Sequence, residues 1–201
     1  MKFTDLSFAD LRSTCINEAK RIREKTDIDL IVFVERAGLP LALYMNEVFN
    51  CKTLGIRATR KADTLKSIFF KWGGGLLPVK IKNFLRLIEY KSGIHKKHTH
   101  RNITFNIDMT DLERAAVRKI LIIDDSVDTG ASMLSVYNKV RETFPASEIY
   151  TYALNVFTES EQLIKIDFFT IRDSIIRTPM SKDSHEHSEF LKMCREHGLS
   201  D

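Results

Sequence analysis

Short apolar runs alternate along this chain with segments in which apolar residues recur at helical spacing. Four or five consecutive apolar residues, as in Leu30–Val34 and Ile120–Ile123, indicate strands buried on both faces. The pattern predicts strands at 30–34, 53–59, 103–107, 120–123, 149–156, and a short pair at 167–170 and 174–177. It predicts helices at 7–25, 39–49, 78–92, 133–142 and 184–196. Because strands and helices alternate, we expect an α/β fold with a doubly wound, mainly parallel sheet flanked by helices.

One strand leads into a distinctive group of side chains. Asp124 and Asp125 directly follow Ile120–Ile123, and a tight turn of small residues then leads to the helix at 133–142. In an open α/β sheet this strand end is where ligands bind, and free N–H groups at a helix start form a cradle for phosphate. A carboxylate pair repels phosphate but suits sugar hydroxyls or a divalent metal. The combination indicates a sugar phosphate ligand.

Composition restricts the class of protein without identifying the ligand. The length of 201 residues fits one domain, and 43% hydrophobic with 29% charged residues fits a soluble globular protein. Three cysteines lie far apart in the sequence, which predicts free thiols in a reducing compartment. The sequence has no leader pattern and no apolar run of membrane-spanning length, so we expect a cytoplasmic protein.

The charge balance leaves the partner open. A net charge of +4 suits an anionic small substrate, but it also suits nucleic acid or an anionic membrane surface. His95, His98 and His100 are interspersed with Lys96 and Lys97 in one basic loop. The lysines would repel a metal cation, so solvated histidines or an anion-contacting patch are expected there instead of zinc.

Residues 120–132 resemble the thirteen-residue signature of the type I phosphoribosyltransferases, which bind 5-phosphoribosyl-1-pyrophosphate (PRPP). The resemblance implies one domain over residues 1–201, with a helical insertion at about 60–100 and a small hood at about 158–184. It implies transfer of the 5-phosphoribosyl group from PRPP to an acceptor, with release of pyrophosphate. Mg²⁺ is the implied cofactor.

The resemblance also assigns roles within the signature. Asp124 and Asp125 would hold the ribose hydroxyls and contact Mg²⁺ indirectly, through those hydroxyls or water. Asp128 would be the general base that takes a proton from the acceptor, since a carboxylate does not itself favour phosphate. These three aspartates form the expected catalytic set. The ribose and 5-phosphate would be held by Asp124, Asp125, Ser126, Val127, Asp128, Thr129, Gly130, Ala131 and Ser132.

The segment 29–40 resembles the pyrophosphate loop of the same family. A buried strand ends there in Glu35, Arg36, Ala37 and Gly38, before a helix. Arg36 would pair with pyrophosphate, and Gly38 would permit close approach. Alanine stands at position 37, where the family usually has glycine, which leaves the family's cis peptide open at this loop. Further basic candidates for pyrophosphate follow in the expected mobile catalytic loop: Arg57, Arg60, Lys61 and Lys66.

The acceptor is less well defined by the sequence. The 6-oxopurine enzymes of the family carry a lysine after the strand that corresponds to 150–157, but here no lysine occurs before Lys165. Only Phe168 or Phe169 could supply the aromatic that stacks on a base. The sequence therefore favours a glycan hydroxyl in surface polysaccharide synthesis, since some relatives with a long middle insertion transfer phosphoribose to a glycan.

Two alternatives stay open. The first is salvage of a purine base, hypoxanthine, guanine or xanthine. The second is a PRPP-sensing regulator that binds nucleic acid, although the modest charge and the lack of an added domain argue against a nucleic-acid partner. A homodimer and peripheral membrane contact without a transmembrane segment are also open.

Overall fold

The computed structural model describes residues 2–60, 101–105 and 117–199. The chain divides into two compact units, residues 1–58 with 103–201 and residues 59–102. The expected helix at 78–92, the histidines of the basic loop, Lys61 and Lys66 lie outside the described residues, as does the Arg60 side chain.

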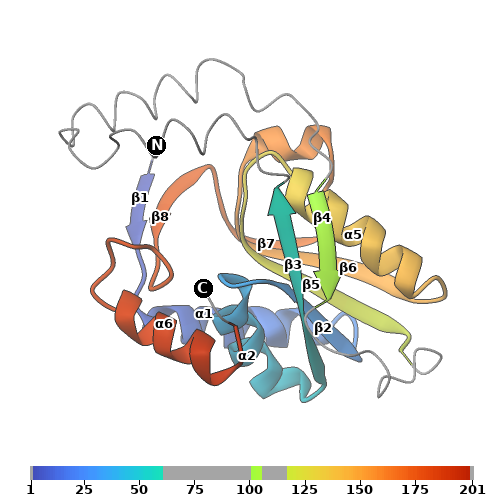
Figure 1. The fold of residues 1–201 in the computed structure, drawn as a ribbon, viewed down its shortest axis with the longest axis horizontal. Helices are drawn as coiled ribbons and strands as arrows, with labels where there is room; N and C mark the ends of the chain where they lie inside the picture. Colours follow the sequence, from blue (N-terminus) through green and yellow to red (C-terminus); the bar gives the residue numbers. More distant parts are fainter. Residues whose placement is uncertain (1, 61–100, 106–116, 200–201) are drawn as a thin grey trace. The chain divides into compact units, whose positions relative to one another are not determined.

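A mainly parallel sheet forms the centre of this unit (Figure 1). Its strand order is β4-β3-β2-β5-β6-β7. The pairs β2–β3, β2–β5, β5–β6 and β6–β7 are all parallel, whereas Figure 1 shows the edge strand β4 running opposite to β3. The bounds are β2 Leu30–Val34, β3 Lys52–Arg60, β4 Arg101–Phe105, β5 Lys119–Val127, β6 Glu148–Val156 and β7 Phe168–Arg172.

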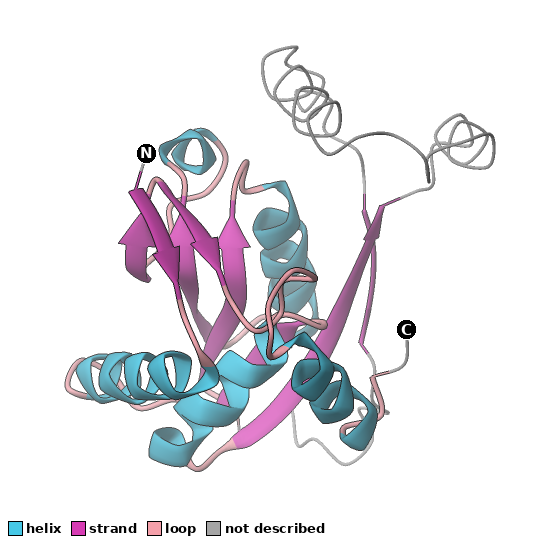
Figure 2. Cartoon of the chain, turned by 90° about the vertical axis from the view of Figure 1, so that its left-hand side faces the viewer, coloured by secondary structure: helices cyan, strands magenta, loops and turns pink. Residues whose placement is uncertain are grey.

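Helices cover both faces of the sheet (Figure 2). Helix α1 (Phe8–Arg23) and helix α2 (Gly38–Phe49) pack beside each other on one face, where Ile31, Phe33 and Leu121 join their core. Helix α5 (Ala131–Thr143) packs on the other face against a second core that contains Val32 and Ile122. Alternate residues of the same strands thus serve opposite cores, as the continuous apolar runs predict. The expected doubly wound α/β architecture is confirmed.

The amino end of α1 follows its sequence signals closely. Ser7 is the N-cap, its hydroxyl accepts from the Asp10 N–H, and the Asp10 carboxylate accepts from the Ser7 N–H at 3.0 Å. The last helix, α6 (His187–Glu196), begins later than the expected residue 184. Turns at Ser181–Ser184 and Ser184–His187 use these residues' backbone groups before the helix begins.

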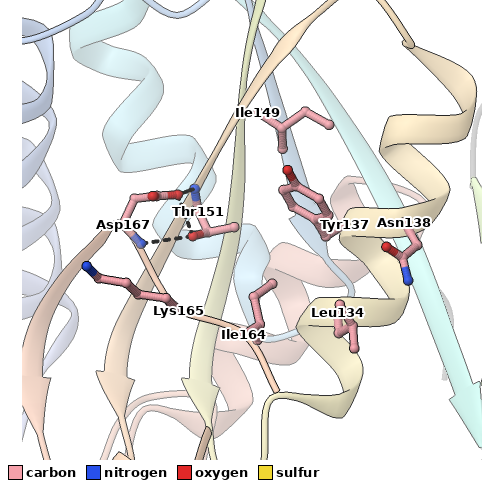
Figure 3. Close-up of a pocket in the computed structure, with 8 residues that line it drawn as sticks. All are labelled: Leu134, Tyr137, Asn138, Ile149, Thr151, Ile164, Lys165 and Asp167. Carbon is pink, nitrogen blue, oxygen red and sulfur yellow. Dashed lines mark hydrogen bonds between the residues drawn. The ribbon is translucent and has the colours of Figure 1, made fainter. Parts of the chain in front are cut away.

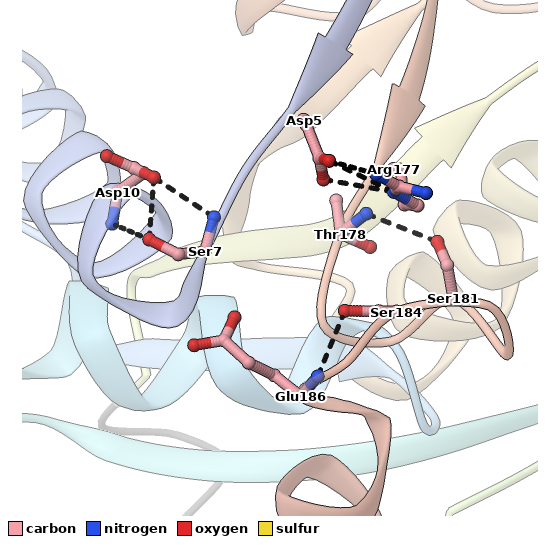
Figure 4. A network of polar contacts seen from close by, with 8 residues as sticks. All are labelled: Asp5, Ser7, Asp10, Arg177, Thr178, Ser181, Ser184 and Glu186. Carbon is pink, nitrogen blue, oxygen red and sulfur yellow. Dashed lines mark hydrogen bonds and ion pairs between the residues drawn. The ribbon is translucent and has the colours of Figure 1, made fainter.

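A second, two-stranded sheet joins distant parts of the sequence, and Figure 4 shows polar contacts of the residues around it. Strand β1 (Lys2–Asp5) pairs in parallel with β8 (Ser174–Arg177), and Asp5 forms an ion pair with Arg177. The strands expected at 167–170 and 174–177 are both present, but they do not pair with each other, because β7 joins the main sheet. Asp173, with a positive φ of 51°, turns the chain between the two strands.

Strand β5 is longer than its apolar run predicts. It continues through Asp124 and Asp125 to Val127 because β6 keeps pairing with it, from Asp124 opposite Ala153 to Val127 opposite Val156. The carboxylate pair thus lies within the last part of the strand, where the backbone is fixed on one side by β6.

Candidate active site

The two loops that the sequence analysis assigned to the substrate follow neighbouring strands, β2 and β5. From β2 the chain continues to β3 on one side, and from β5 it continues to β6 on the other. The order of the strands therefore reverses between β2 and β5, and such a switch point creates a crevice at the carboxyl ends of the strands. The segments Glu35–Gly38 and Asp124–Ser132 begin at this position. The topology brings the two predicted segments together.

The Asp124 carboxyl group is buried, with only 7% of the residue exposed. Its Oδ1 accepts a hydrogen bond from the Asp125 backbone N–H at 2.9 Å. Burial, followed by the charge of Asp125, raises the pKa of Asp124 well above its usual value. Burial likewise raises the pKa of Asp125. Two neighbouring carboxyl groups with raised pKa values favour any ligand that donates hydrogen bonds to them or brings a positive charge.

The turn after β5 delivers the start of α5 to the same end of the sheet. Gly130, which has no side chain, is the N-cap of α5, and the first turn of the helix carries no acidic residue. The Thr129 and Ser132 hydroxyls flank this start, and neither has a hydrogen-bond partner among the described residues. A helix amino end with free N–H groups and hydroxyls fits a phosphate group.

Gly130 is required at its position for two reasons. Its φ is +81°, a conformation that side chains rarely adopt. A Cβ would also lie 2.9 Å from Ile164 Cγ2 and 3.0 Å from the Ser160 carbonyl oxygen. Ser160 belongs to the short helix η4 (Thr158–Gln162), which follows β6. The close approach of η4 to the turn therefore depends on glycine.

Asp128 differs from the other two aspartates in its surroundings. It is exposed, and its Oδ1 accepts a hydrogen bond from the Ser126 hydroxyl at 3.1 Å. This contact holds the carboxylate at the outer side of the turn while leaving its other oxygen to solvent. The position suits a group that meets a second molecule instead of the phosphate.

The loop after β2 begins with a cis peptide bond between Glu35 and Arg36. Ala37 has ordinary helical angles, with φ −67° and ψ −26°, so the cis bond does not need glycine at position 37. Gly38 allows a close approach, but to protein: a Cβ there would lie 3.0 Å from the Ile123 carbonyl oxygen of β5. Glycine at 38 thus lets the start of α2 pack on β5. The Arg36 guanidinium lies over the Phe190 ring of α6, 6.0 Å from its centre.

The sequence analysis missed a contact between this loop and β3. Arg57 Nε donates to Glu35 Oε2 at 3.0 Å, and the Glu35 side chain is only 2% exposed. The two residues are far apart in the sequence, and only the parallel register of β2 and β3 brings them together, with Val34 opposite Ile56. No local pattern could have indicated the pair.

The end of β6 carries no basic side chain among residues 157–164, as the sequence indicates. The Thr158 N–H and hydroxyl both donate to the Asp173 carboxylate, at 2.8 and 2.6 Å. These bonds lower the pKa of Asp173. Phe168 is buried in the core, whereas Phe169 lies under the Arg172 guanidinium at 4.6 Å from the ring centre. The β6 end therefore presents hydroxyl and carboxylate groups.

A pocket of about 240 Å³ lies elsewhere, between α5, β6 and the segment before β7 (Figure 3). Within it, the Thr151 N–H and hydroxyl donate to Asp167 at 2.9 and 2.8 Å. None of the predicted substrate residues lines it. The lining residues are Leu134, Tyr137, Asn138, Ile149, Thr151, Ile164, Lys165 and Asp167.

Metal-ligating groups are sparse in the part of the chain that the structure describes. No three histidine, cysteine or acidic side chains there gather in a way that could hold a metal ion. Cys15, Cys51 and Cys194 form no disulfide in the described part of the chain, as predicted. A search of the described helices finds none with the length and apolar character needed to cross a membrane.

The raised pKa of Asp124 gives a testable pH dependence. Between the unfolded and the raised folded-state pKa, the folded protein binds more protons, so its free energy of unfolding falls as pH rises through this window. Asp124→Asn removes the ionisable carboxyl group and with it this fall in the free energy of unfolding. We expect the variant to be more stable than the unsubstituted protein at neutral pH, and the difference to vanish in acid below the usual aspartate pKa.

Urea unfolding at a series of pH values measures this difference. Asp27→Asn is the matched control, because the Asp27 side chain is 82% exposed and pairs with Arg23 only at the surface, at 3.4 Å, so its substitution should change stability little. An Asp124→Asn variant that is less stable than the unsubstituted protein at every pH would contradict the interpretation.

No protein-family model matches the sequence, and no curated protein matches it. Solved structures match its fold over nearly the whole chain. Xanthine-guanine-hypoxanthine phosphoribosyltransferase of Helicobacter pylori has a TM-score of 0.63 at 17% identity and covers 97% of this chain and 99% of its own. A purine phosphoribosyltransferase of Pyrococcus horikoshii has a TM-score of 0.58 at 18% identity, covering 92% and 97%.

A hypothetical protein of Neisseria gonorrhoeae, solved with bound ppGpp, has a TM-score of 0.60 at 11% identity and covers 98% of this chain and 97% of its own. At these identities the likeness concerns the fold. The chain has the type I phosphoribosyltransferase fold, which confirms the architecture that the signature implied.

Proposed function

We propose that this protein is a phosphoribosyltransferase that transfers the 5-phosphoribosyl group of PRPP to an acceptor and releases pyrophosphate. The observation that carries the proposal is the arrangement at the switch point between β2 and β5. The carboxylate pair, of which Asp124 is buried, lies in the last part of β5, the open amino end of α5 comes after it, and the loop with Arg36 follows β2. Sugar hydroxyls, a phosphate and a second anionic group would each find a complementary partner there.

Different residues of the site bind different parts of PRPP. The carboxylates of Asp124 and Asp125 accept hydrogen bonds from the ribose hydroxyls, and the N–H groups at the start of α5 with the Thr129 and Ser132 hydroxyls hold the 5-phosphate. Arg36 neutralises charge that develops on pyrophosphate as it leaves C1. Asp128 faces the acceptor and takes its proton. Asp124→Asn should accordingly weaken PRPP binding.

The carboxylate pair also fits Mg²⁺. Mg²⁺ in phosphate-transfer sites is commonly bound by one or two carboxylates together with substrate oxygens. A cation would also favour the charged form of Asp124, whose pKa is raised by burial and then by the charge of Asp125. Since no three protein ligands gather among the described residues, we propose that Asp124 and Asp125 contact the ion through ribose hydroxyls or water. Bound Mg²⁺ would neutralise negative charge on pyrophosphate.

A purine base is the first candidate for the acceptor. Two solved structures that match this chain over more than nine tenths of its length are named as purine phosphoribosyltransferases. A purine ring N–H loses its proton more readily than a sugar hydroxyl, so an exposed Asp128 suffices as a base. The sequence-based preference for a glycan has no support from these neighbours.

A glycan hydroxyl is the second candidate because of one feature of the described residues. The segment from Phe157 to Ile164 contains Glu159 and Glu161 and no lysine, so it offers no cation to a purine oxygen. The hydroxyl and carboxylate groups at the end of β6 resemble sugar-binding surfaces in their chemistry instead.

One experiment separates these candidates. The protein is incubated with PRPP and Mg²⁺ and with parallel panels of purine bases and glycans, and pyrophosphate release is followed. We expect Mg²⁺-dependent release with hypoxanthine, guanine or xanthine. Release only with a glycan would favour the second candidate. Calorimetry that shows no PRPP binding with or without Mg²⁺ would remove the proposed function, and specific DNA binding without transfer would indicate a regulator.

A further inference from the structure

The Glu35 carboxylate occupies an unusual position for a charged group. Its side chain is 2% exposed, at the end of β2, and its backbone N–H donates to the Ile56 carbonyl oxygen of β3 at 3.0 Å. One carboxylate oxygen, Oε2, accepts from Arg57 Nε. The other, Oε1, is buried without a hydrogen-bond partner among the described residues. A buried carboxylate oxygen without a hydrogen bond lowers the stability of the folded protein. The position of Glu35 therefore indicates a role other than stability.

Gly55 provides the space that this carboxylate occupies. A Cβ at residue 55 would lie 3.0 Å from Glu35 Oε1 and 3.1 Å from Phe33 Cζ. Phe33 and Glu35 point to the same face of the sheet as Gly55 and Arg57, because paired residues of parallel strands share a face. The absence of a side chain at Gly55 thus leaves space on this face for the Glu35 carboxylate, directly beside Arg57.

Arg57 itself is only partly covered. Its side chain is 43% exposed, and its terminal Nη groups make no hydrogen bond to the described residues. A guanidinium has several donors in a fixed fork, so a contact through Nε leaves the outer edge with both Nη groups able to bind an anion. Arg57 lies on β3 next to the loop that holds Arg36. Two arginines are therefore present at the same strand ends.

We propose that Glu35 is a positioning residue that fixes Arg57 as a second arginine for the pyrophosphate end of PRPP, beside Arg36. The inference rests on the proposed function and gives Glu35 a role through Arg57 instead of direct contact with pyrophosphate, which its charge would repel. Added stability does not explain the pair, because an ion pair that buries one carboxylate contributes little net free energy.

The test measures binding at the two ends of the substrate separately. Calorimetry with pyrophosphate and Mg²⁺ reports the pyrophosphate end, and ribose 5-phosphate reports the end held by α5. We expect Arg57→Ala to weaken pyrophosphate binding by about tenfold to a hundredfold. Glu35→Gln keeps the shape and should weaken it by about threefold to tenfold. Both variants should bind ribose 5-phosphate as the unsubstituted protein does.

Coupling distinguishes positioning from a general loss of structure. Glu35→Gln added to Arg57→Ala should weaken pyrophosphate binding no further, because Glu35 acts only through Arg57. Glu47→Gln is the matched control: Glu47 pairs with Arg12 at 2.6 Å on the exposed surface of α1 and α2, and its loss should change neither affinity.

Three results would overturn the proposal while the proposed function stands. The first is unchanged pyrophosphate binding in Arg57→Ala, and the second is equal losses of pyrophosphate and ribose 5-phosphate binding in Glu35→Gln. The third is independent, additive effects of the two substitutions. Failure of the unsubstituted protein to bind PRPP, pyrophosphate or ribose 5-phosphate would remove the proposed function and this inference together.

Discussion

Asp128→Asn is expected to lower the rate of phosphoribosyl transfer by about 10²–10⁴-fold while PRPP affinity stays close to that of the unsubstituted protein. Asp128 is exposed at the outer side of the turn after β5, and the Ser126 hydroxyl holds one of its oxygens at 3.1 Å. Asparagine can keep that hydrogen bond but cannot take a proton from the acceptor. The loss should therefore fall on turnover.

Single-turnover release of pyrophosphate, with the acceptor found in the panel, measures the rate, and calorimetry measures PRPP affinity. Asp27→Asn, an exposed aspartate on another part of the surface, serves as the control and should change neither quantity. Near-normal turnover in Asp128→Asn would show that another group is the base. A loss of PRPP affinity as large as the loss of rate would place Asp128 in the substrate cradle.

Gly130→Ala should lower the free energy of unfolding by about 2–4 kcal/mol, from the left-handed backbone and from overpacking together. The φ of +81° disfavours any side chain, and the new Cβ would meet Ile164 and the Ser160 carbonyl oxygen at 3.0 Å or less. Since Gly130 caps α5, the shift should also weaken ribose 5-phosphate binding.

Gly198→Ala separates the two causes. Gly198 has a similar φ of +70°, but nothing lies within 4 Å of a Cβ there, so only the backbone cost of about 1–2 kcal/mol is expected. Denaturant unfolding of both variants gives the two free energies, and their difference measures the contact with η4. Equal losses in the two variants would show that η4 moves away at little cost.

The elements that sequence predicts best are those with complete local signals. Ile120–Ile123 has an uninterrupted apolar run, and apolar residues recur at helical spacing over 7–25, so a strand and a helix were both expected where they occur. The alternation of strands with helices predicted a doubly wound, mainly parallel sheet, whereas the order of the strands comes from the structure. That order is sufficient to place the β2 loop beside the β5 loop.

Features that depend on contacts between residues far apart in the sequence could not be predicted from local sequence patterns. Strand β1 has only four residues and its partner β8 is at the other end of the sequence, so nothing local indicated a strand. The length of β5 depended on continued pairing with β6, which an aspartate pair does not suggest. Glu35 could be assigned to the pyrophosphate loop from its position, but its ion pair with Arg57 required the register of two strands.

The pairing of β1 with β8 has a consequence for the order in which the chain folds. Asp5 and Arg177 are separated by 172 positions, so β1 leaves the ribosome long before its partner exists. At ordinary rates of synthesis the interval is roughly 9–34 s. Closing so long a loop is slow compared with local helix formation, and the core around β2 and β5 does not need it. The small sheet can therefore form only after most of the chain has been synthesised.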